Sequence, residues 1–567
     1  MIDNVQVIVA TILSIAMMSA SCSREDINST PADFSQISVI CGDSAKVAGF
    51  VNNIYSNLPS GYNRLRGSSM VGASTDEAVH AVRGSAAEKW GTGSWGPTAL
   101  FDDPFPNSYA AIRKTFIFEQ EILPRVNRNV MTAFGQNLLW GQVLFLRALY
   151  NFELLKRFGG YPIVKSVLVS DQDLNIPRST YDECVAYISD LCDQASSMLP
   201  VSYLEAQFGR ATKGAALALK ARLLLYAASP LFNNPDASAD GFEHGSYDPQ
   251  KWENAAKAAF EVINLKDGAS PVYALFPDYE TFFTTLAGNK EIIFSNIEGA
   301  SNRIERLNGP VSITDAEGGT NPSLELVDAY EMADGTPFSW DNPVQANHPF
   351  DGRDPRFYSS ILYNGATWMN KMTIEAFENG KDKVGNKATR TSFYLRKFLS
   401  INARWNAPIG NAYHCFPLFR YGEVLLNYAE AMNEVYGPDQ TPVAFGMTSR
   451  QAVALIRKRA GLTGNVDLSR DVPKGDKSKM REAIRHERRI ELAFEEHRHL
   501  DLRRWKTAQQ VLNRPVHGLI ILKRTDNSFV YKKVEVENRV FDSKMYLYPF
   551  PQAEMNRNSN LVQNTGW

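Results

Sequence analysis

Four helical patterns follow one another along residues 136–264, and they constrain the fold more than any other feature of this chain. Their apolar residues recur with the spacing of one helix face, which predicts helices over about residues 136–158, 181–198, 211–229 and 252–264. Gly159 and Gly160 end the first pattern, and Thr180 with Glu183 forms a capping box at the start of the second.

Small residues on these helices allow close contact between neighbouring helices. The alanines concerned are Ala148, Ala215, Ala216, Ala218, Ala221, Ala255, Ala256, Ala258 and Ala259. Stacked helix pairs of this kind are typical of tetratricopeptide-like arrays. The spacing between the patterns is too loose to establish such a repeat from its period alone.

Residues 268 to about 415 have a different character. Helical periodicity fades, Gly, Asn, Asp and Pro are frequent, and short apolar runs occur at 291–297 and 393–399. This pattern predicts irregular loops and short strands, and such loops are the part of a protein most able to form a binding surface. Helical patterns then return at about residues 419–436, 449–459 and 478–499.

The last 22 residues, 546–567, are unusually apolar for a chain end. They contain Tyr546, Tyr548, Phe550, two prolines and the terminal Trp567. A free segment of this composition would leave much apolar area in water. We therefore expect the tail to be packed on the body of the protein.

The tail and seven further stretches form an ordered set of motifs. The seven stretches are "TDEA" (75–78), "RALYNFELLKRFGGYP" (147–162), "ALKARLLLYAASP" (218–230), "RDPRFY" (353–358), "FRYGEVLLNYAEAMNE" (419–434), "IRKRAGL" (456–462) and "IRHERRIELAFEEHRHLDLRRW" (484–505). In this order they resemble the signatures of the SusD/RagB family of outer-membrane nutrient-binding lipoproteins. The resemblance implies an α+β, predominantly helical fold. In that fold a tetratricopeptide-like helix-pair scaffold carries a loop-rich ligand-binding region.

The N-terminus predicts an export signal. Residues 5–18 form an apolar run that is too short to span a bilayer but suits a signal peptide. Small residues at 19–21 precede Cys22, as in a lipobox, whose cysteine becomes lipidated. No Lys or Arg precedes the run, and Ser19 stands where Leu is usual, so an ordinary secretory signal is the alternative.

These features predict four segments. Residues 1–21 are a lipoprotein signal peptide, and residues 22–35 are a polar tether. Residues 36–267 are an N-terminal part with the tetratricopeptide-like helices, and residues 268–567 are a SusD/RagB-like C-terminal part. We expect the last two to pack as one body.

Composition argues against several classes of function. The net charge is −2, so the chain has no excess of positive charge that would attract nucleic acid. None of the five cysteines forms a CxxC motif, which makes a cysteine zinc site improbable. Cys184 and Cys192 lie about 12 Å apart along a predicted helix, too far for a disulfide.

Three apparent catalytic motifs fail on inspection. His486-Glu487 begins a zinc-protease motif, but Ile490 stands where the second histidine belongs. Residues 91–96 match GxGxxG without the preceding strand that a dinucleotide site needs. Asp102-Asp103 are neighbours on a loop, not two carboxylates facing each other across a sugar. The sequence predicts no enzyme and no cofactor, and it indicates no metal-ligating residues.

The predicted helix at 478–499 carries many charges. Opposite charges lie three residues apart at Glu482–Arg485, Arg488–Glu491 and Glu495–Arg498, which favours local ion pairs. Its apolar stripe consists of Met480, Ile484, Ile490 and Phe494. This pattern indicates a structural ion-pair network and not a catalytic or metal role for His486, His497 or His499.

Tryptophans in loop contexts are the candidate ligand-binding residues, because flat aromatic faces stack on sugar rings. They are Trp90, Trp95, Trp340, Trp368 and Trp405, whereas Trp140, Trp252 and Trp505 lie in or beside helices and are expected to pack. Trp95 stands between Gly93-Ser94 and Gly96-Pro97, which predicts a turn on the surface. Packing is the alternative interpretation for each loop tryptophan. The resemblance adds Asp76 and Arg396 as glycan-binding candidates, with Asp76 and Trp95 best matched.

The resemblance implies a function without catalysis. It implies a protein anchored by Cys22 to the outer membrane and exposed at the cell surface, which binds oligosaccharide or polysaccharide. It also implies delivery of that ligand to a TonB-dependent, SusC-like transporter. A peptide-binding member of the same family is one alternative, and an exported glycoside hydrolase is another. Gathering of Trp90, Trp95, Trp340 and Trp368 on one exposed face would favour glycan over peptide.

Overall fold

The computed structural model describes residues 32–65, 69–169, 173–204, 207–234, 247–369, 372–385, 387–405 and 411–567. The predicted signal peptide, Cys22 and residues 23–31 of the predicted tether lie outside these ranges. The first described element, α2 (Ala32–Cys41), begins inside the stretch predicted as tether. Within the described ranges, no helix combines the length and apolar character that crossing a membrane requires.

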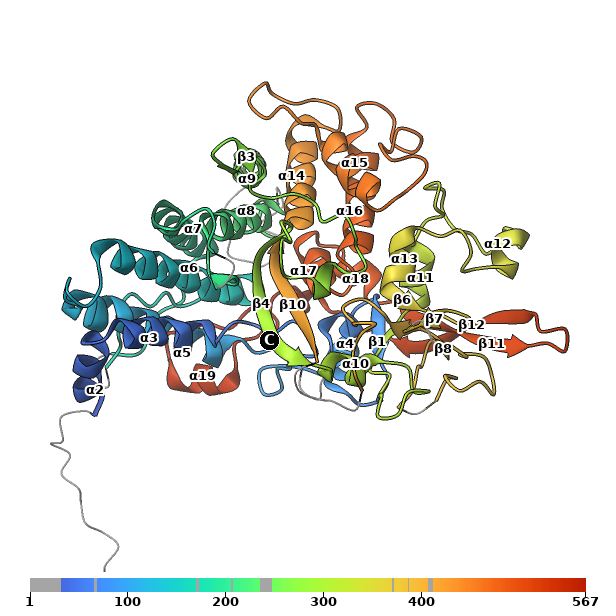
Figure 1. The fold of residues 1–567 in the computed structure, drawn as a ribbon, viewed down its shortest axis with the longest axis horizontal. Coiled ribbons are helices and arrows are strands. Elements are labelled where there is room, and N and C mark those ends of the chain that lie inside the picture. The colour runs from blue at the N-terminus through green and yellow to red at the C-terminus, as the bar shows by residue number, and fades with distance from the viewer. Residues whose placement is uncertain are drawn as a thin grey trace, which may run out of the picture.

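An array of stacked helices forms one side of the molecule (Figure 1). In packing order its members are α5 (Phe105–Ile117), α6 (Ala133–Phe158), α7 (Tyr181–Met198), α8 (Lys213–Ala228), α9 (Gln250–Ile263), α14 (Tyr421–Tyr436) and α15 (Ser449–Arg459). Each helix packs against the next one. The four helices predicted between residues 136 and 264 are confirmed to within three residues at each end, and so is the capping box of α7.

Small side chains explain how closely this array packs. Ala215, Ala216 and Ala221 on α8 have no exposed surface, because α7 and α9 cover this helix from two sides. The array also crosses the boundary predicted at residue 267, since α14 from the C-terminal part packs on α8 and α9.

Further helices lie outside this array. They are α3 (Ser44–Tyr55), α4 (Ala86–Gly91), α10 (Arg303–Asn308), α11 (Leu324–Ala329), α12 (Pro343–Asn347), α13 (Pro355–Ser360), α16 (Lys477–Glu491), α17 (His497–Arg504), α18 (Ala508–Val511) and α19 (Gln552–Arg557).

The described strands pair only two by two, and every pair is antiparallel. The pairs are β1 (Ala78–His80) with β5 (Thr320–Pro322), β2 (Lys266–Asp267) with β3 (Ser270–Pro271), β4 (Ile292–Ser301) with β10 (Ala412–Arg420), β6 (Ile361–Leu362) with β9 (Tyr394–Leu395), β7 (Thr367–Trp368) with β8 (Met372–Thr373), and β11 (Pro515–Lys523) with β12 (Phe529–Asn538). Residues 268–415 form loops and strands, as predicted, but also the short helices α10 to α13, which were not predicted. The apolar run 291–297 becomes most of β4, whereas 393–399 yields only the two residues of β9.

The helix predicted at 478–499 is broken, so that prediction is wrong. α16 ends at Glu491 and α17 starts at His497. Between them Phe494 and Glu496 have φ angles of 64° and 65°, the left-handed region that few non-glycine residues adopt. The predicted stripe of Met480, Ile484, Ile490 and Phe494 is nevertheless buried.

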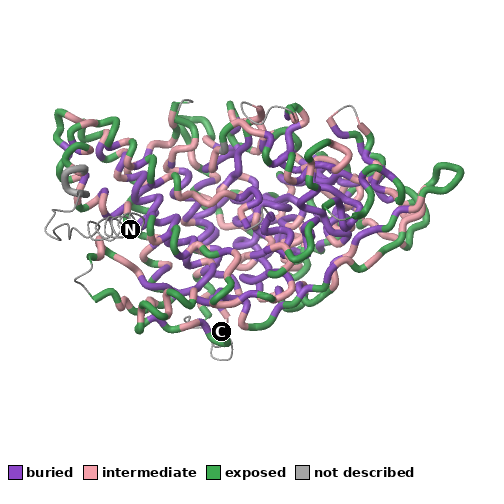
Figure 2. Tube along the Cα trace, turned by 90° about the horizontal axis from the view of Figure 1, so that it is seen from below, coloured by how far each residue is buried: buried purple, intermediate pink, exposed green. Residues whose placement is uncertain are grey.

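The C-terminal tail is packed on the body, as predicted. Tyr548 and Phe550 are 1% and 0% exposed. The Tyr548 amide donates to the Arg157 carbonyl at 2.8 Å, and the Asn564 side chain donates to the carbonyls of Phe158 and Tyr548. Figure 2 shows buried segments through the interior and exposed segments at the rim.

Candidate functional site

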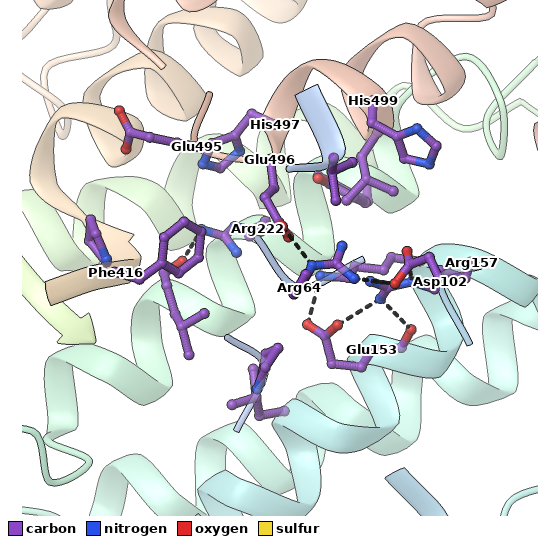
Figure 3. A pocket seen from close by; sticks show the side chains of 18 residues that line it. Arg64, Asp102, Glu153, Arg157, Arg222, Phe416, Glu495, Glu496, His497 and His499 are labelled. Atoms are coloured by element: carbon purple, nitrogen blue, oxygen red, sulfur yellow. Dashed lines mark hydrogen bonds and ion pairs between the residues drawn. The ribbon is translucent and has the colours of Figure 1, made fainter. Parts of the chain in front are cut away.

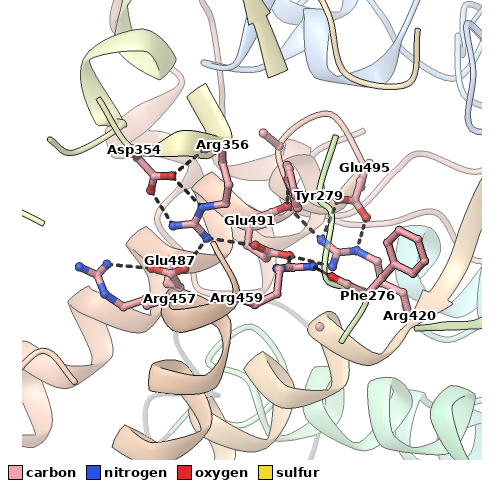
Figure 4. A network of polar contacts seen from close by, with 12 residues as sticks. Phe276, Tyr279, Asp354, Arg356, Arg420, Arg457, Arg459, Glu487, Glu491 and Glu495 are labelled. Atoms are coloured by element: carbon pink, nitrogen blue, oxygen red, sulfur yellow. Dashed lines mark hydrogen bonds and ion pairs between the residues drawn. The ribbon is translucent and has the colours of Figure 1, made fainter. Parts of the chain in front are cut away.

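A buried ion-pair network joins the helical array to the loop-rich part (Figure 4). Glu491 on α16 has no exposed surface and pairs with Arg356 of α13 at 3.0 Å, with Arg420 of β10 at 2.8 Å and with Arg459 of α15. Burial alone would raise the pKa of Glu491, but the three guanidiniums outweigh it and hold that pKa well below its ordinary value. The network therefore links α16 to α13, β10 and α15 and has a structural role.

The same network corrects the predicted local ion pairs. Glu491 and Glu495 bind cations from distant segments, with Lys397 at 2.7 Å from Glu495. Arg488 pairs with Asp501 at 3.0 Å and not with Glu491, and Arg498 pairs with Asp76. The predicted role of these charges as a structural network holds, but the predicted partners three residues away are wrong.

A second polar cluster surrounds a small cavity of about 40 Å³ (Figure 3). Asp102 accepts from Arg157 Nε at 2.8 Å and pairs with Arg64, and Arg157 also pairs with Glu153 at 2.6 Å. Although burial opposes it, these arginines hold the pKa of Asp102 well below its ordinary value. A glycosidase acid needs a raised pKa, and this cavity has the size for water and not for a sugar.

Asp76, the best-matched polar candidate, lies inside the protein. It is 7% exposed, and its carboxylate accepts from Arg498 at 2.8 and 2.9 Å and pairs with Arg489 at 2.8 Å. Two half-buried guanidiniums therefore occupy the carboxylate that was expected to bind sugar hydroxyls.

Trp90 and Trp95 are buried as well, at 4% and 8% exposed. Trp95 lies 4.8 Å from Trp567 and 5.5 Å from Tyr548 between ring centres, and 6.2 Å from Trp90. The expectation that Trp95 stands on an exposed turn is wrong, because the C-terminal tail covers it. In this arrangement the two indoles pack against protein and present no open face to a ligand.

Glu77, next to Asp76, has an unusual environment. Its side chain is buried, its Oε1 accepts from the Phe494 amide at 3.4 Å, and its Oε2 has no partner among the described residues. Burial, and then the negative charge of Asp76, raise the pKa of Glu77 to about 8. The folded protein therefore favours the protonated carboxyl near neutral pH.

This environment predicts a pH-dependent effect of Glu77→Gln. Because the folded pKa lies above the unfolded one, the favourable contribution is complete below about pH 4.3 and is lost as pH rises through 8. Glutamine mimics the protonated form. Between pH 5 and pH 9, the stability of the variant relative to the native chain should rise by about 4 kcal/mol in free energy of unfolding.

Urea unfolding at a series of pH values measures this difference. Glu535→Gln, at an exposed position, is the matched control and should show no such trend. A difference between Glu77→Gln and the native protein that stays constant with pH would show that Glu77 titrates normally.

Trp340 lies apart from the other candidates. Its indole is half-buried, and its Nε1 donates to both carboxylate oxygens of Asp328 at 3.1 Å. Its ring neighbours are Phe338 at 5.3 Å and Tyr531 at 6.3 Å. The predicted tryptophans thus do not gather on one exposed face.

The structure does bring together the three remaining candidates, Trp368, Arg396 and Trp405. The Arg396 guanidinium lies 5.8 Å from the centre of the Trp368 ring, and Trp405 Nε1 donates to the sulfur of Met369 at 3.2 Å. Trp368 has no exposed surface, whereas Arg396 and Trp405 are half-buried. We name residues 302–309, 367–369 and 396–405 the Trp405 loop cluster.

Backbone contacts fix Trp405 within this cluster. The Asn302 side chain donates to the carbonyls of Arg404 and Trp405 at 2.9 and 3.2 Å. The ring lies against Gly309, where an added Cβ would come within 2.7 Å of it, so only glycine allows this approach. Asn402 and Arg404 beside it are exposed. The cluster therefore offers a fixed, partly open indole bordered by polar side chains, the combination that binds sugars.

One hollow in the surface was not found from the sequence. It measures about 1210 Å³ and lies between the segments 201–204 and 207–212, the loop 286–290 and the pair β4–β10. We name it the ribbon groove. Tyr413 and Phe208, which line it, are 58% and 36% exposed. The sequence contains no signal for it, because Tyr413 is a single exposed residue near the start of a mostly buried strand.

The histidines and cysteines of the described chain offer no metal site. Burial lowers the pKa of His486 to about 4 and the pKa values of His497 and His499 further. Among the described residues, no group of three or more His, Cys, Asp and Glu is arranged to hold a metal ion. Cys41, Cys184, Cys192 and Cys415 are buried and free, so the described cysteines form no disulfide framework.

Comparisons with known proteins agree with this architecture. A family model described as "SusD family" matches residues 290–567, and one described as "Starch-binding associating with outer membrane" matches residues 29–225. The chain is 25% identical over 439 residues to a SusD-like protein P2 of Formosa agariphila, which covers 76% of this chain and 74% of that protein.

Solved structures from Bacteroides fragilis show the same fold. A SusD-like protein is 28% identical with a TM-score of 0.76, covering 93% of this chain and 98% of its own. A SusD-like carbohydrate-binding protein is 24% identical with a TM-score of 0.73, covering 92% of this chain and 100% of its own.

Proposed function

Because the chain belongs to the SusD/RagB family of non-catalytic outer-membrane glycan-binding proteins, we propose that it captures glycans at the bacterial surface through the Trp405 loop cluster. In this proposal the glycan then passes to a TonB-dependent, SusC-like transporter. The observation that carries the proposal is the half-buried Trp405 indole, held by Asn302 and Gly309 next to the exposed Asn402 and Arg404.

The chemistry of the cluster suits reversible capture. An indole face binds the C–H side of a sugar ring, and neighbouring amide and guanidinium groups bind hydroxyls. Arg396 holds the Trp368 side of the cluster in place. Its guanidinium lies over the Trp368 ring and pairs with Glu280 at 2.6 Å. Such contacts exchange rapidly, which helps the release of a ligand to a transporter. Asp76, Trp90 and Trp95 act in this proposal as packing, and Trp340 has no assigned contact with sugar.

The first prediction of this proposal concerns Trp405→Ala. The loss of a central aromatic anchor commonly costs 1–2 kcal/mol or more, and about 1.4 kcal/mol corresponds to a tenfold change in Kd. We expect at least tenfold weaker binding to the glycan that the native protein binds, with the fold unchanged because the indole is partly exposed. Affinity electrophoresis with a panel of neutral polysaccharides, followed by calorimetry, measures this.

The matched control is Phe134→Ala. Phe134 is 75% exposed at the start of α6, so its removal deletes a surface aromatic outside the cluster. It should leave glycan affinity unchanged. If the native protein and Trp405→Ala bind the glycan equally well, the Trp405 loop cluster is not the glycan site. Binding of a tryptic peptide mixture in place of every glycan would favour the peptide-binding alternative.

The second prediction concerns the anchor. Cys22 follows small residues and an apolar run, as in a lipobox. Expressed in its native host, Cys22→Ala should move the protein from the membrane to the soluble fraction in cells that lack the partner transporter. Fractionation and immunoblotting measure this, with Cys41→Ala, at a buried position in α2, as the control. Membrane association that survives in Cys22→Ala under these conditions would contradict lipid anchoring.

A further inference from the structure

The ribbon groove has an unusual balance of charge. Among the described residues that line it are two cations, Arg210 and Lys290, and no Asp or Glu. An adjoining hollow of about 380 Å³ shares Arg210 with the ribbon groove, and the described residues of its lining also include no carboxylate. The overall chain is nearly neutral, with a net charge of −2, so this local excess of positive charge is a property of the groove itself.

Neither cation is neutralised by a carboxylate among the described residues. Arg210 is half-buried, and its guanidinium donates to the amide oxygens of Gln142 and Asn52, both at 3.1 Å. Lys290 is exposed and forms no ion pair with any described residue. Buried arginines elsewhere, such as Arg356 and Arg420, meet carboxylates directly. Arg210 keeps further N–H groups for an external acceptor, because a guanidinium carries five donors.

The groove also offers aromatic surface beside these cations. Tyr413 on β10 and Phe208 on the opposite wall are 58% and 36% exposed. Gly209, with a φ of 92°, lets this wall approach β4, since a Cβ at residue 209 would lie 2.8 Å from Ile297 of that strand. One lining hydroxyl, Ser202, donates to Asp267 at 3.3 Å. The volume of about 1210 Å³ exceeds the ~300–1,000 Å³ usual for a drug-sized ligand, so a chain of several units fits better than a single ring.

We propose that the ribbon groove binds a second stretch of glycan that carries anionic groups, carboxylate or sulfate. This rests on the proposed glycan-binding function but uses a different site from the Trp405 loop cluster. The aromatic rings hold sugar faces, and Arg210 and Lys290 bind the anions. Charge-assisted hydrogen bonds contribute more than neutral ones, and they fix which glycans are preferred.

The test compares probes of different charge. Calorimetry with the full mature chain uses polygalacturonate for carboxylate and a sulfated galactan for sulfate. It also uses a neutral glycan from the Trp405 panel and polyglutamate as an acidic peptide. We expect the native protein to bind at least one anionic polysaccharide, and raising the salt concentration should weaken this binding because the ions screen exposed charges.

Variants locate the binding. Arg210→Gln with Lys290→Gln should weaken binding to the anionic polysaccharide at least tenfold and leave neutral-glycan binding unchanged. Lys290→Gln alone and Tyr413→Ala, both at exposed positions, should each weaken it several-fold and keep the inference testable if the Arg210 variant is unstable. Lys458→Gln, at an exposed position on α15 outside the groove, is the control for net charge.

Three results would overturn the inference. They are no binding of either anionic polysaccharide, equal binding by these groove variants and the native protein, or polyglutamate bound as tightly as the sugars. The two proposals fail separately, because Trp405→Ala should weaken neutral-glycan binding and leave the groove intact.

Discussion

Removal of residues 546–567 should prevent the protein from folding cooperatively. The segment buries Tyr546, Leu547, Tyr548, Phe550 and Leu561, each 6% exposed or less. Burial of such a side chain contributes about 1.5–3 kcal/mol, so together they contribute on the order of 10 kcal/mol. That equals the whole stability of a typical domain. Circular dichroism and urea unfolding of the truncated chain measure the loss.

A graded series checks that the cause is packing of the tail. Tyr548→Phe removes a hydroxyl that lies 2.6 Å from His499 Nε2 and 3.1 Å from Asp102, and should cost about 1–3 kcal/mol. Arg557→Ala, at an exposed position on α19, should cost almost nothing. A truncated chain that unfolds cooperatively, with the same urea midpoint as the native protein, would contradict this view of the tail.

Glu491→Gln should cost about 3–5 kcal/mol in free energy of unfolding. The substitution removes the negative charge that pairs with the guanidiniums of Arg356, Arg420 and Arg459, while these side chains stay inside the protein. The native pKa of Glu491 is depressed, so its contribution is present above about pH 4.3 and is lost as pH falls toward the folded pKa. The difference between variant and native protein should therefore shrink in acid.

Urea unfolding at pH 7 and pH 3 measures both effects. Glu482→Gln on the same helix is the matched control, because Glu482 is exposed and pairs with no cation among the described residues. A cost for Glu491→Gln no larger than that for Glu482→Gln would show that the network contributes little to stability.

The helical array and the tail were predictable because their signals are local. Periodicity, the capping box at Thr180 and Glu183 and the stop at Gly159 depend on neighbouring residues, and the helices between 136 and 264 follow them closely. The break between α16 and α17 was not predictable in this way. The left-handed turn at Phe494 and Glu496 places Glu495 against Lys397 and Glu496 against Arg64, and no helix pattern records such distant partners.

The site residues show the same division. Gly and Pro flank Trp95 and predict an exposed turn, but Trp567, far along the chain, covers it. Trp405, with Arg396, had the least support from the sequence, since nothing near it indicates that Asn302 and Gly309 fix its position. Tyr413 was missed because the ribbon groove forms only when β10 meets the loop at 286–290.

Hydrogen–deuterium exchange of the full mature chain, with and without a bound neutral glycan, tests the central claim most directly. The Trp405 loop cluster accounts for binding if the glycan slows exchange in peptides that cover residues 302–309, 367–369 and 396–405. The tail around Trp95 and Trp567 should not change. Calorimetrically confirmed glycan binding with unchanged exchange in all three segments would contradict the account.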